Sequence, residues 1–315
     1  MLEQVPDPVV GTGQVLVRVS ASGVQFVETQ IRAGTMPGPA AMSPGALPWT
    51  PGREVAGVVA ALGDGVDPEL LGRRVAGLTA AGSGGYAELA VLAAPSAHLL
   101  PDGLDFADAV SLLGTGRTAA GLVQTTGIGP GDTVLVESAA GAVGVLLLQL
   151  ARAAGAERVI GLARGEQKLK LVRDFGADTA IDYSEDDWPE QVRAVAPQGV
   201  SVVVDGVGGE TGRRAFELLA PQGRLVVFGL ASGSMTKLDP ERVAERGVTV
   251  HSYFGPPTGD RSPEAGLRQT REVIAAVAAG RLRPFVGRRF PLAEAAAAHA
   301  AITARETVGK TVLIP

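Results

Sequence analysis

From about Thr133 onward the chain alternates short apolar β runs with helical segments, and this alternation constrains the fold more than any other feature. Buried β runs that alternate with helices are typical of a parallel sheet covered by helices on both faces. The middle of the chain is therefore expected to form an α/β, doubly wound Rossmann-type sheet. The expected β runs are 133–136, 159–162, 179–181, 201–204 and 224–228, and the expected helices are 143–154, 166–175, 185–195 and 211–219.

The segments before and after this alternating region have a different residue pattern. Short β runs such as 15–19 and 55–59 are separated by glycine and proline, which mark turns and loops. The segment 34–52 is rich in both residues and is expected to be a loop. The tail from about residue 284 offers another β-helix-β sequence, in which the alanine-rich stretch 293–301 is helical. These patterns predict a β-rich domain in addition to the Rossmann-type domain.

A glycine fingerprint lies between the first β run and the first helix of the alternating region. Residues 139–144 read Ala-Ala-Gly-Ala-Val-Gly, a variant of the motif that binds dinucleotides. The pyrophosphate of a dinucleotide must approach main-chain N–H groups at a helix N-terminus, so a side chain at the first glycine would hold it away, while the second glycine allows close packing. A tight turn without a ligand is the alternative. The predicted coenzyme contacts here are Gly141, Ala142, Val143 and Gly144.

The residues after the second β run indicate which dinucleotide binds. Sites that prefer NAD usually carry a carboxylate about 20 residues beyond the fingerprint, where it accepts a hydrogen bond from the ribose. This chain instead places Arg164 and Lys168 there, and cations stabilise the 2′-phosphate of NADPH through charge-assisted hydrogen bonds. NADPH is therefore the predicted coenzyme. The alternative is a set of solvated charges at the start of a helix, and Glu166 could pair with one of the cations.

Composition argues against several other classes of protein. The chain contains no cysteine, so it can form neither disulfides nor thiolate metal sites, and its three histidines, His98, His251 and His299, are too far apart for a common zinc motif. No metal site is expected. The formal net charge of -5 argues against nucleic-acid binding. Since no bilayer-spanning apolar stretch and no export signal are visible, we expect a cytoplasmic protein that does not enter membranes.

Five segments occur in the order that is found in the medium-chain dehydrogenases/reductases: 23–34, 52–54, the glycine fingerprint, 205–208 and 309–313. Over nearly its whole length the chain resembles the zinc-free quinone oxidoreductase branch of that superfamily, the relatives of zeta-crystallin. The resemblance implies a GroES-like catalytic domain made of residues 1–115 and 256–315, and a Rossmann NADPH-binding domain made of residues 116–255. It also implies an active site in the cleft between the domains and a homodimer formed through the strand near 248–253.

The resemblance also carries further coenzyme contacts onto matching positions of this chain. It implies that Lys168 and Tyr183 lie near the 2′-phosphate, and that Thr118 and the Phe228-Gly229 backbone lie near the nicotinamide. Two more segments are implied to contact the coenzyme. They contribute Gly206 and Val207, after the fourth β run, and Arg305 and Lys310, near the C-terminus.

The chain departs from the family pattern at several places. Gln25 stands where the family usually has asparagine, and Gln30 stands where it often has tyrosine, so the substrate preference cannot be copied from relatives. Zinc-dependent members have histidine at the position of Arg53. The β run that normally precedes residues 5–8 is absent, so either the barrel is incomplete or the start has been assigned short.

These features lead to three functional hypotheses. Without a metal to polarise an alcohol, the expected reaction is hydride transfer from NADPH to an acceptor that is already electrophilic. The first hypothesis is a quinone reductase, and the second is an enoyl or alkenal double-bond reductase. The third is a protein that binds NADPH or a partner without turnover.

The reduced acceptor needs a hydrogen bond to its developing negative charge. Gln25 is the predicted donor, with Arg32, Tyr86 and Tyr253 as further candidates, and the second proton is expected to come from water. As alternatives, Arg32 would form a surface ion pair with Glu28 at helical spacing, and Tyr86 would pack in an ordinary strand.

Overall fold

The computed structural model describes residues 2–35, 48–253 and 262–315. The chain divides into two compact units, the first made of Met1–Gly116 and Leu267–Pro315 and the second of Arg117–Gly266. The boundary that the sequence suggested at 255/256 falls among residues 254–261, which lie outside the described residues, as does most of the expected loop 34–52.

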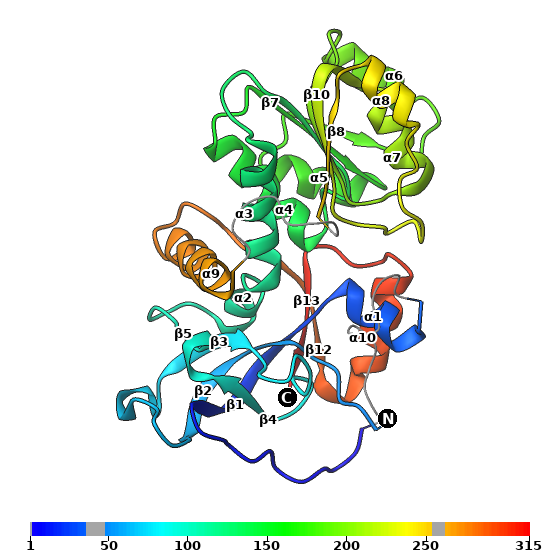
Figure 1. Cartoon of the computed structure of the whole chain (residues 1–315). Helices are drawn as coiled ribbons and strands as arrows, with labels where there is room; N and C mark the ends of the chain where they lie inside the picture. The colour runs from blue at the N-terminus through cyan, green and yellow to red at the C-terminus, as the bar shows by residue number, and fades with distance from the viewer. Residues whose placement is uncertain (1, 36–47, 254–261) are drawn as a thin grey trace. The chain divides into compact units, whose positions relative to one another are not determined.

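The first unit contains a sheet of seven described strands, to which both ends of the chain contribute. Antiparallel β1 and β13 are neighbours, with Ser22 opposite Leu313, and Figure 1 shows blue β1 next to red β13. The sheet order is β12 (Val286–Pro291), β13 (Lys310–Ile314), β1 (Gln14–Val24), β2 (Glu54–Leu62), β3 (Arg74–Leu78) and β5 (His98–Leu99), with β4 (Leu89–Ala93) also paired to β1.

The side chains of β1 explain how this sheet is covered. Burial alternates along its first part, where Val15, Val17 and Val19 are buried, and becomes continuous from Ala21 to Val24. The alternating part therefore has one face in the core, and the continuous part is covered on both faces. The helices of this unit are α1 (Phe26–Ala33), α2 (Phe106–Val110) and α10 (Ala295–Thr303), with single 3-10 turns at Pro68–Leu70, Ala94–Ser96 and Leu292–Glu294.

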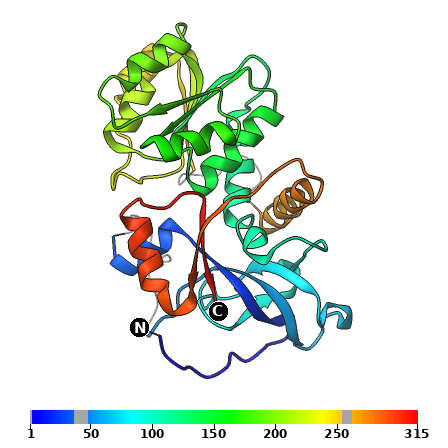
Figure 2. The same ribbon diagram turned by 180° about the vertical axis from the view of Figure 1, so that it is seen from behind.

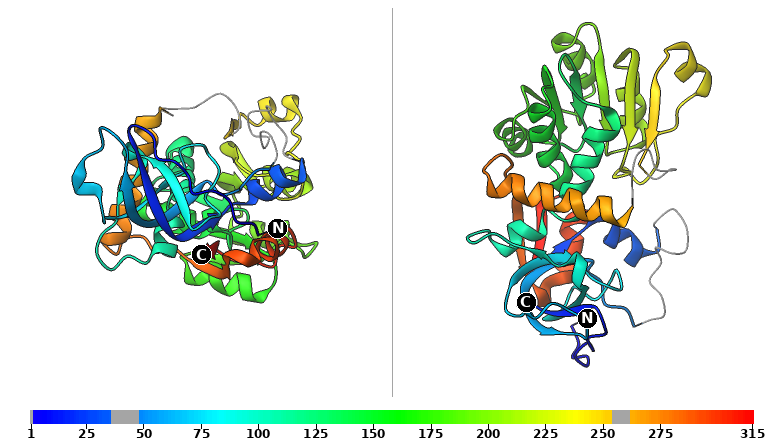
Figure 3. Two further views of the ribbon diagram at one scale, coloured as in Figure 1. Left: turned by 90° about the horizontal axis from the view of Figure 1, so that it is seen from below. Right: turned by 60° about the vertical axis from the view of Figure 1, so that its left-hand side comes forward.

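The second unit contains a fully parallel sheet, and this confirms the predicted fold class. Its described strands run β11 (Thr249–Ser252), β10 (Leu219–Val227), β9 (Val200–Asp205), β6 (Thr133–Val136), β7 (Arg158–Ala163) and β8 (Thr179–Asp182). Helices cover both faces, as Figures 1 and 2 show from opposite sides, and the right-hand view of Figure 3 shows yellow β11 at one edge. The helices are α4 (Ala142–Ala153), α5 (Glu166–Asp174), α6 (Trp188–Val195), α7 (Gly209–Phe216) and α8 (Pro240–Glu245).

Two helices, α3 (Gly114–Thr126) and α9 (Pro263–Ala278), cross the division between the units. None of the helices in the described ranges has the length and apolar character that crossing a membrane requires. The order of the strands reverses between β6 and β9, because β7 and β8 follow on one side and β10 and β11 on the other. Ligands of open α/β sheets bind at the carboxyl ends of the strands at such a reversal.

Two element boundaries differ from the sequence-based expectation. The helix expected at 211–219 ends at Phe216, because Leu219 pairs with Val200 and begins β10 before an irregularity in the strand. The helix expected at 185–195 begins at Trp188. Backbone pairing with a distant strand sets the first boundary, whereas local turns at Glu185 and Trp188 precede the second helix.

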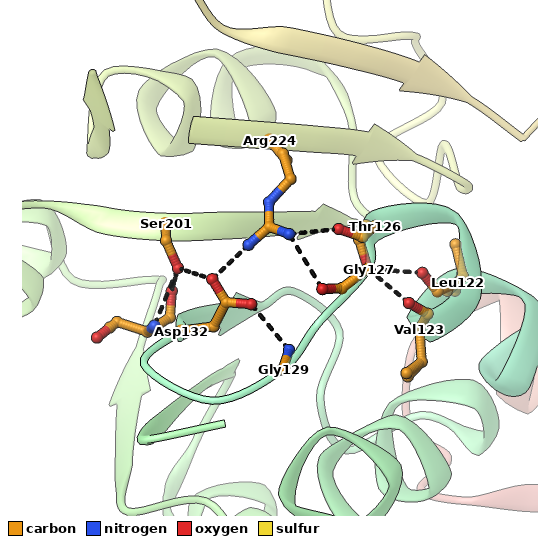
Figure 4. Close-up of polar contacts among 9 residues, drawn as sticks. Leu122, Val123, Thr126, Gly127, Gly129, Asp132, Ser201 and Arg224 are labelled. Atoms are coloured by element: carbon orange, nitrogen blue, oxygen red, sulfur yellow. Dashed lines mark hydrogen bonds and ion pairs between the residues drawn. The ribbon is translucent and has the colours of Figure 1, made fainter. Parts of the chain in front are cut away.

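A polar network fixes the amino ends of three neighbouring strands of the second unit (Figure 4). Asp132 accepts a 2.7 Å hydrogen bond from the Ser201 hydroxyl and pairs with Arg224, which also donates to the main-chain oxygens of Thr126 and Gly127 at the end of α3. Burial opposes ionisation of Asp132, but these hydrogen bonds and the guanidinium charge outweigh it and lower the pKa of the carboxyl group. This end of the sheet is therefore held rigidly by charge-assisted bonds, and it lies opposite the carboxyl end at which ligands bind.

Candidate coenzyme and active site

The glycine fingerprint forms the loop that joins β6 to α4; we call residues 138–144 the fingerprint loop. Ser138 adopts a left-handed conformation with φ 52°, and its carbonyl oxygen accepts a 2.9 Å hydrogen bond from the N–H of Gly141, the N-cap of α4. A β-carbon at Gly144 would lie 2.5 Å from the carbonyl oxygens of Ser138 and Ala139. Glycine is therefore required at Gly144 for close packing.

A β-carbon at Gly141 would lie 3.2 Å from the Ser138 oxygen, so a side chain there would crowd the beginning of α4. Gly141, Ala142 and Val143 are only partly buried. Backbone that remains accessible at a helix N-terminus can approach a pyrophosphate closely. The structure thus places the four predicted fingerprint residues together in one turn at the beginning of α4.

The predicted 2′-phosphate contacts follow the next two strands. Arg164 is exposed directly after β7, Lys168 lies in the first turn of α5, and Tyr183 comes directly after β8. The turn that carries Arg164 is held by Asp182, which accepts a 2.7 Å hydrogen bond from the N–H of Gly165. Burial opposes ionisation of Asp182, but its hydrogen bonds and the charge of Arg164 lower the pKa of the carboxyl group.

Glu166, which could have neutralised this cationic region, forms an ion pair with Arg173. Both side chains of that pair are exposed. A position beside Arg164 and Lys168 would attract a phosphate by charge and by hydrogen bonding.

A third segment completes this end of the sheet; we call residues 206–208 the glycine turn. A β-carbon at Gly206 would lie 2.7 Å from the ring of Phe228, and one at Gly229 would lie 2.4 Å from the oxygen of Gly206. The N–H of Phe228 donates a 2.9 Å hydrogen bond to the oxygen of Asp205. The ends of β9 and β10 therefore meet through glycine. The structure brings together four residues that were predicted to contact the coenzyme: Gly206, Val207, Phe228 and Gly229.

Two further predicted residues belong to the second unit. Thr118 lies partly buried in α3, and the hydroxyl of Tyr253 lies 3.3 Å from the position of a β-carbon on Gly121 in the same helix. The N–H of Tyr253 donates to the oxygen of Val227 at 2.8 Å, so the residue follows the end of β11. Tyr253 thus shares a unit with the fingerprint loop, whereas Gln25, Arg32 and Tyr86 belong to the first unit.

In the first unit a buried carboxyl group joins two of the predicted catalytic residues. Oε2 of Glu28 accepts a 2.8 Å hydrogen bond from the N–H of Gln25 and a 2.9 Å hydrogen bond from the hydroxyl of Tyr86, and Oε1 accepts from the N–H of Arg53 at 3.1 Å. The Tyr86 hydroxyl also lies 3.0 Å from Nε2 of His299. We call Glu28, Tyr86 and His299 the buried triad.

The triad corrects two alternatives drawn from the sequence. Glu28 is 1% exposed, so a surface ion pair between Glu28 and Arg32 is wrong. Tyr86 precedes β4 and bonds to two polar groups, so ordinary strand packing is also wrong for it. Arg32, Tyr86 and His299 line a cavity of about 2020 Å³ in this unit.

Burial controls the ionisation of the triad. It raises the pKa of Glu28 and, together with the negative charge of Glu28, raises the pKa of Tyr86 far above its ordinary value. Burial and then the charge of Arg32 lower the pKa of His299 to about 4. At neutral pH the phenol therefore keeps its proton and the imidazole is uncharged.

The two C-terminal residues predicted to reach the coenzyme are also in the first unit. Nζ of Lys310 lies 2.6 Å from Oε2 of Glu54, and both side chains are buried. Oε1 of Glu54 accepts a 2.7 Å hydrogen bond from the N–H of Gly114. The charge of Lys310 is thus already balanced within the unit. Arg305 follows α10 with a left-handed φ of 59°, an uncommon conformation for a residue with a side chain.

Comparisons with known proteins agree with this geometry. Residues 11–102 match the alcohol dehydrogenase GroES-like domain, and residues 142–267 match the zinc-binding dehydrogenase family. A quinone oxidoreductase of Pseudomonas aeruginosa is 36% identical over 97% of this chain and 92% of its own length. The chain belongs to the quinone oxidoreductase branch of the medium-chain dehydrogenase/reductase superfamily.

Two further members of this superfamily are informative. A 2-haloacrylate reductase of a Burkholderia species is 36% identical over 97% of this chain and 92% of its own length. The crystal structure of Escherichia coli quinone oxidoreductase complexed with NADPH has a TM-score of 0.87 and 30% identity, and covers 100% of this chain and 95% of its own. The same fold has thus been observed in a relative that holds NADPH.

The name of the zinc-binding dehydrogenase family suggests a zinc site, but the residue types of this chain do not match one. The sequence has no cysteine, and Arg53 follows Gly52. Within residues 2–35, 48–253 and 262–315 no group of three or more His, Asp or Glu side chains could hold a metal ion.

Sequence reasoning about this superfamily member missed its buried ionisable partners: Glu28, Glu54, Glu137 and His299. Glu28 has a local signal, because it forms a capping box with Gln25 three residues earlier, whereas Glu54, Glu137 and His299 meet their partners through tertiary packing.

Proposed function

We propose that this protein is an NADPH-dependent reductase that transfers hydride to a quinone and needs no zinc. The observation that carries the proposal is the fingerprint loop, whose two glycines leave room at the start of α4, with the cationic Arg164 directly after the neighbouring strand. The quinone oxidoreductases among its relatives, one of them complexed with NADPH, support the same chemistry.

The second unit would hold the coenzyme. The fingerprint loop accommodates the pyrophosphate, Arg164, Lys168 and Tyr183 bind the 2′-phosphate, and the glycine turn with Thr118 and Phe228-Gly229 lies near the nicotinamide. The assignments of Tyr183, Thr118, the glycine turn and Phe228-Gly229, and those of Arg305 and Lys310, rest on family resemblance. When bound, NADPH supplies the hydride from C4 of its nicotinamide.

The first unit would bind the acceptor. The side-chain amide of Gln25 donates a hydrogen bond to the oxygen that gains negative charge, and the N–H of Gln25 is fixed by Glu28. Arg32 adds positive charge on the same helix. The hydroxyl of Tyr86 is already bonded within the buried triad, so it positions Glu28, and the proton of the product comes from water.

A second candidate is reduction of an activated double bond. The 36% identical relative named 2-haloacrylate reductase favours it, because a haloacrylate is an α,β-unsaturated acid. Both reactions use the same coenzyme and need no metal, so the substrate pocket alone separates them.

The test has two steps. First, isothermal calorimetry compares NADPH with NADH, and Arg164→Ala with the wild-type protein; we expect the variant to lose affinity for NADPH by at least about tenfold and to change little toward NADH. Second, NADPH oxidation is followed with a quinone panel and an enone panel. Turnover with quinones supports the proposal, turnover with enones alone selects the second candidate, and the absence of NADPH binding overturns both.

We also propose that the protein is a cytoplasmic homodimer that binds neither nucleic acid nor membrane. Strand β11 is the edge of the second sheet, and Val250 in it is 40% exposed, so its backbone can pair with a second copy. A monomeric mass in analytical ultracentrifugation at micromolar concentration would contradict the dimer.

A further inference from the structure

Two carboxyl groups, those of Glu137 and Asp205, lie at the carboxyl ends of adjacent strands in the second unit. Glu137 directly follows β6, and Asp205 is the last residue of β9. The two strands pair through Val136 and Val204, and both carboxyl side chains are completely buried. The strand order of the sheet reverses between these two strands, so the pair lies at the position where such sheets bind ligands.

Both carboxyl groups hold the glycine turn. Oε2 of Glu137 accepts a 3.0 Å hydrogen bond from the N–H of Val207, and Oδ1 of Asp205 accepts from the same N–H at 3.1 Å and from the N–H of Gly208 at 2.7 Å. Oδ2 of Asp205 accepts from the hydroxyl of Thr236. A single N–H group therefore divides its hydrogen bond between two acids, and the turn is fixed by both.

Glu137 is also attached to the fingerprint loop. The next residue, Ser138, has a left-handed φ of 52°, and its carbonyl oxygen accepts from the N–H of Gly141 at 2.9 Å. A displacement of Glu137 would thus be transmitted to the fingerprint loop as well as to the glycine turn. The acid pair connects both of the segments that form the coenzyme site.

Two ionised carboxylates could not share this buried position without strong repulsion. Burial and then the charge of Asp205 hold the pKa of Glu137 well above its ordinary value, although the N–H groups of Val207 and Gly206 oppose the shift. Helix α7 approaches the pair through Gly212, where a β-carbon would lie 2.4 Å from Oδ2 of Asp205. Its charged residues Glu210 and Arg213 pair with each other at the surface, and Arg214 donates to the main-chain oxygen of Asp186. The buried position beside Asp205 therefore favours the protonated form of Glu137.

One carboxyl oxygen of the pair makes no hydrogen bond to the described residues. Oε1 of Glu137 is buried and has no hydrogen-bond partner in the part of the chain that the structure describes. An unpaired carboxyl oxygen is far less costly on a neutral acid than on a carboxylate. This atom agrees with a Glu137 that stays protonated.

We propose that Glu137 and Asp205 are positioning residues, whose single shared proton keeps the glycine turn in the conformation that binds the dinucleotide. The inference rests on the proposed NADPH-dependent function and adds a regulation to it. Loss of the proton places two negative charges side by side, which displaces the turn that both acids hold. Coenzyme affinity then falls as the pH rises.

The experiment measures the dissociation constant of NADPH from pH 7 to pH 10 for the full-length wild-type protein and for Glu137→Gln. Glutamine has the shape of a protonated glutamic acid and cannot ionise. Ionisable groups away from the acid pair are the same in both proteins, so the ratio of the two dissociation constants isolates the proton of the pair. We expect the ratio of wild type to variant to rise about tenfold per pH unit once Glu137 ionises.

Asp205→Asn is the second variant, and it is also expected to flatten the pH profile, because one neutral partner suffices to remove the repulsion. Glu157→Gln, an exposed acid of the same unit, is the control and should follow the wild-type profile. Circular dichroism confirms that each variant is folded. Parallel profiles for wild type and both amide variants, with NADPH still bound, overturn the inference and leave the proposed function intact. Failure of the wild-type protein to bind NADPH at pH 7 overturns the proposed function and this inference with it.

Discussion

The hydroxyl of Tyr86 donates a 2.9 Å hydrogen bond to Oε2 of Glu28, the same oxygen that accepts the N–H of Gln25. A buried acid thus joins a tyrosine that precedes β4 to the first residue of the predicted substrate site. The phenol of Tyr86 keeps its proton and donates it to the hydrogen bond with Glu28, because burial and the charge of Glu28 raise the pKa of Tyr86. The position of Gln25 therefore depends, through Glu28, on the contacts of Tyr86 and His299.

Tyr86→Phe tests this relationship. The change removes a hydrogen bond from Glu28 and leaves Nε2 of His299 without its partner at 3.0 Å. We expect the free energy of unfolding in urea to fall by about 1 to 3 kcal/mol. Ser232→Ala removes an exposed hydroxyl and should change it by less than about 0.5 kcal/mol. Equal stability of Tyr86→Phe and wild type would show that the triad does not hold the structure.

His299 predicts how stability depends on acid. The pKa of His299 is lowered from 6.5 to about 4 in the folded protein. Between these two pH values the imidazole is protonated in the unfolded chain and neutral in the folded chain. Stability is fully present above pH 6.5 and is lost as the pH falls toward 4. Across that range we expect a loss of roughly 3 kcal/mol from this residue.

The measurement compares the free energy of unfolding at pH 7 and pH 4.5 in wild type and His299→Gln. The variant should lose less stability on acidification than the wild-type protein does. An identical loss in His299→Gln would contradict a neutral imidazole in the folded protein.

Lys310→Met tests the buried ion pair with Glu54. Removal of one partner leaves a buried, unpaired carboxylate, so the coenzyme-free protein should lose about 3 to 5 kcal/mol of stability. Arg193→Met breaks the exposed pair with Glu190 and should cost less than about 0.5 kcal/mol. If Lys310 acted on the coenzyme alone, thermal unfolding without NADPH would not distinguish Lys310→Met from wild type.

Gly144→Ala tests the close packing of the fingerprint loop. The added carbon would meet two carbonyl oxygens at 2.5 Å, so the loop must shift, with a loss of about 1 to 3 kcal/mol of stability. NADPH affinity should fall by at least about tenfold. Gly129→Ala is the matched control, because the nearest atom to its added carbon lies 3.8 Å away. Calorimetry that finds equal NADPH affinity for both variants would contradict a coenzyme cradle at this loop.

Much of the fold was readable from local patterns. The apolar runs at 159–162, 179–181 and 201–204 each lie within a strand of the parallel sheet, and the helix expected at 143–154 is α4. The fingerprint loop was also predictable, because a strand, a glycine-rich turn and a helix follow one another directly. These features depend on side-chain periodicity and on backbone conformation, which neighbouring residues largely determine.

The partners of the buried charges were not predictable in this way. Tyr86 and His299 are 213 residues apart, and Lys310 and Glu54 are 256 residues apart. Glu137 meets the glycine turn only because β6 and β9 are neighbours in the sheet. The sequence alone determined which segments become strands and helices and where a dinucleotide can approach bare backbone. Only the tertiary structure decided which acids lose contact with water and which group each one faces, because desolvation depends on everything that packs around a side chain.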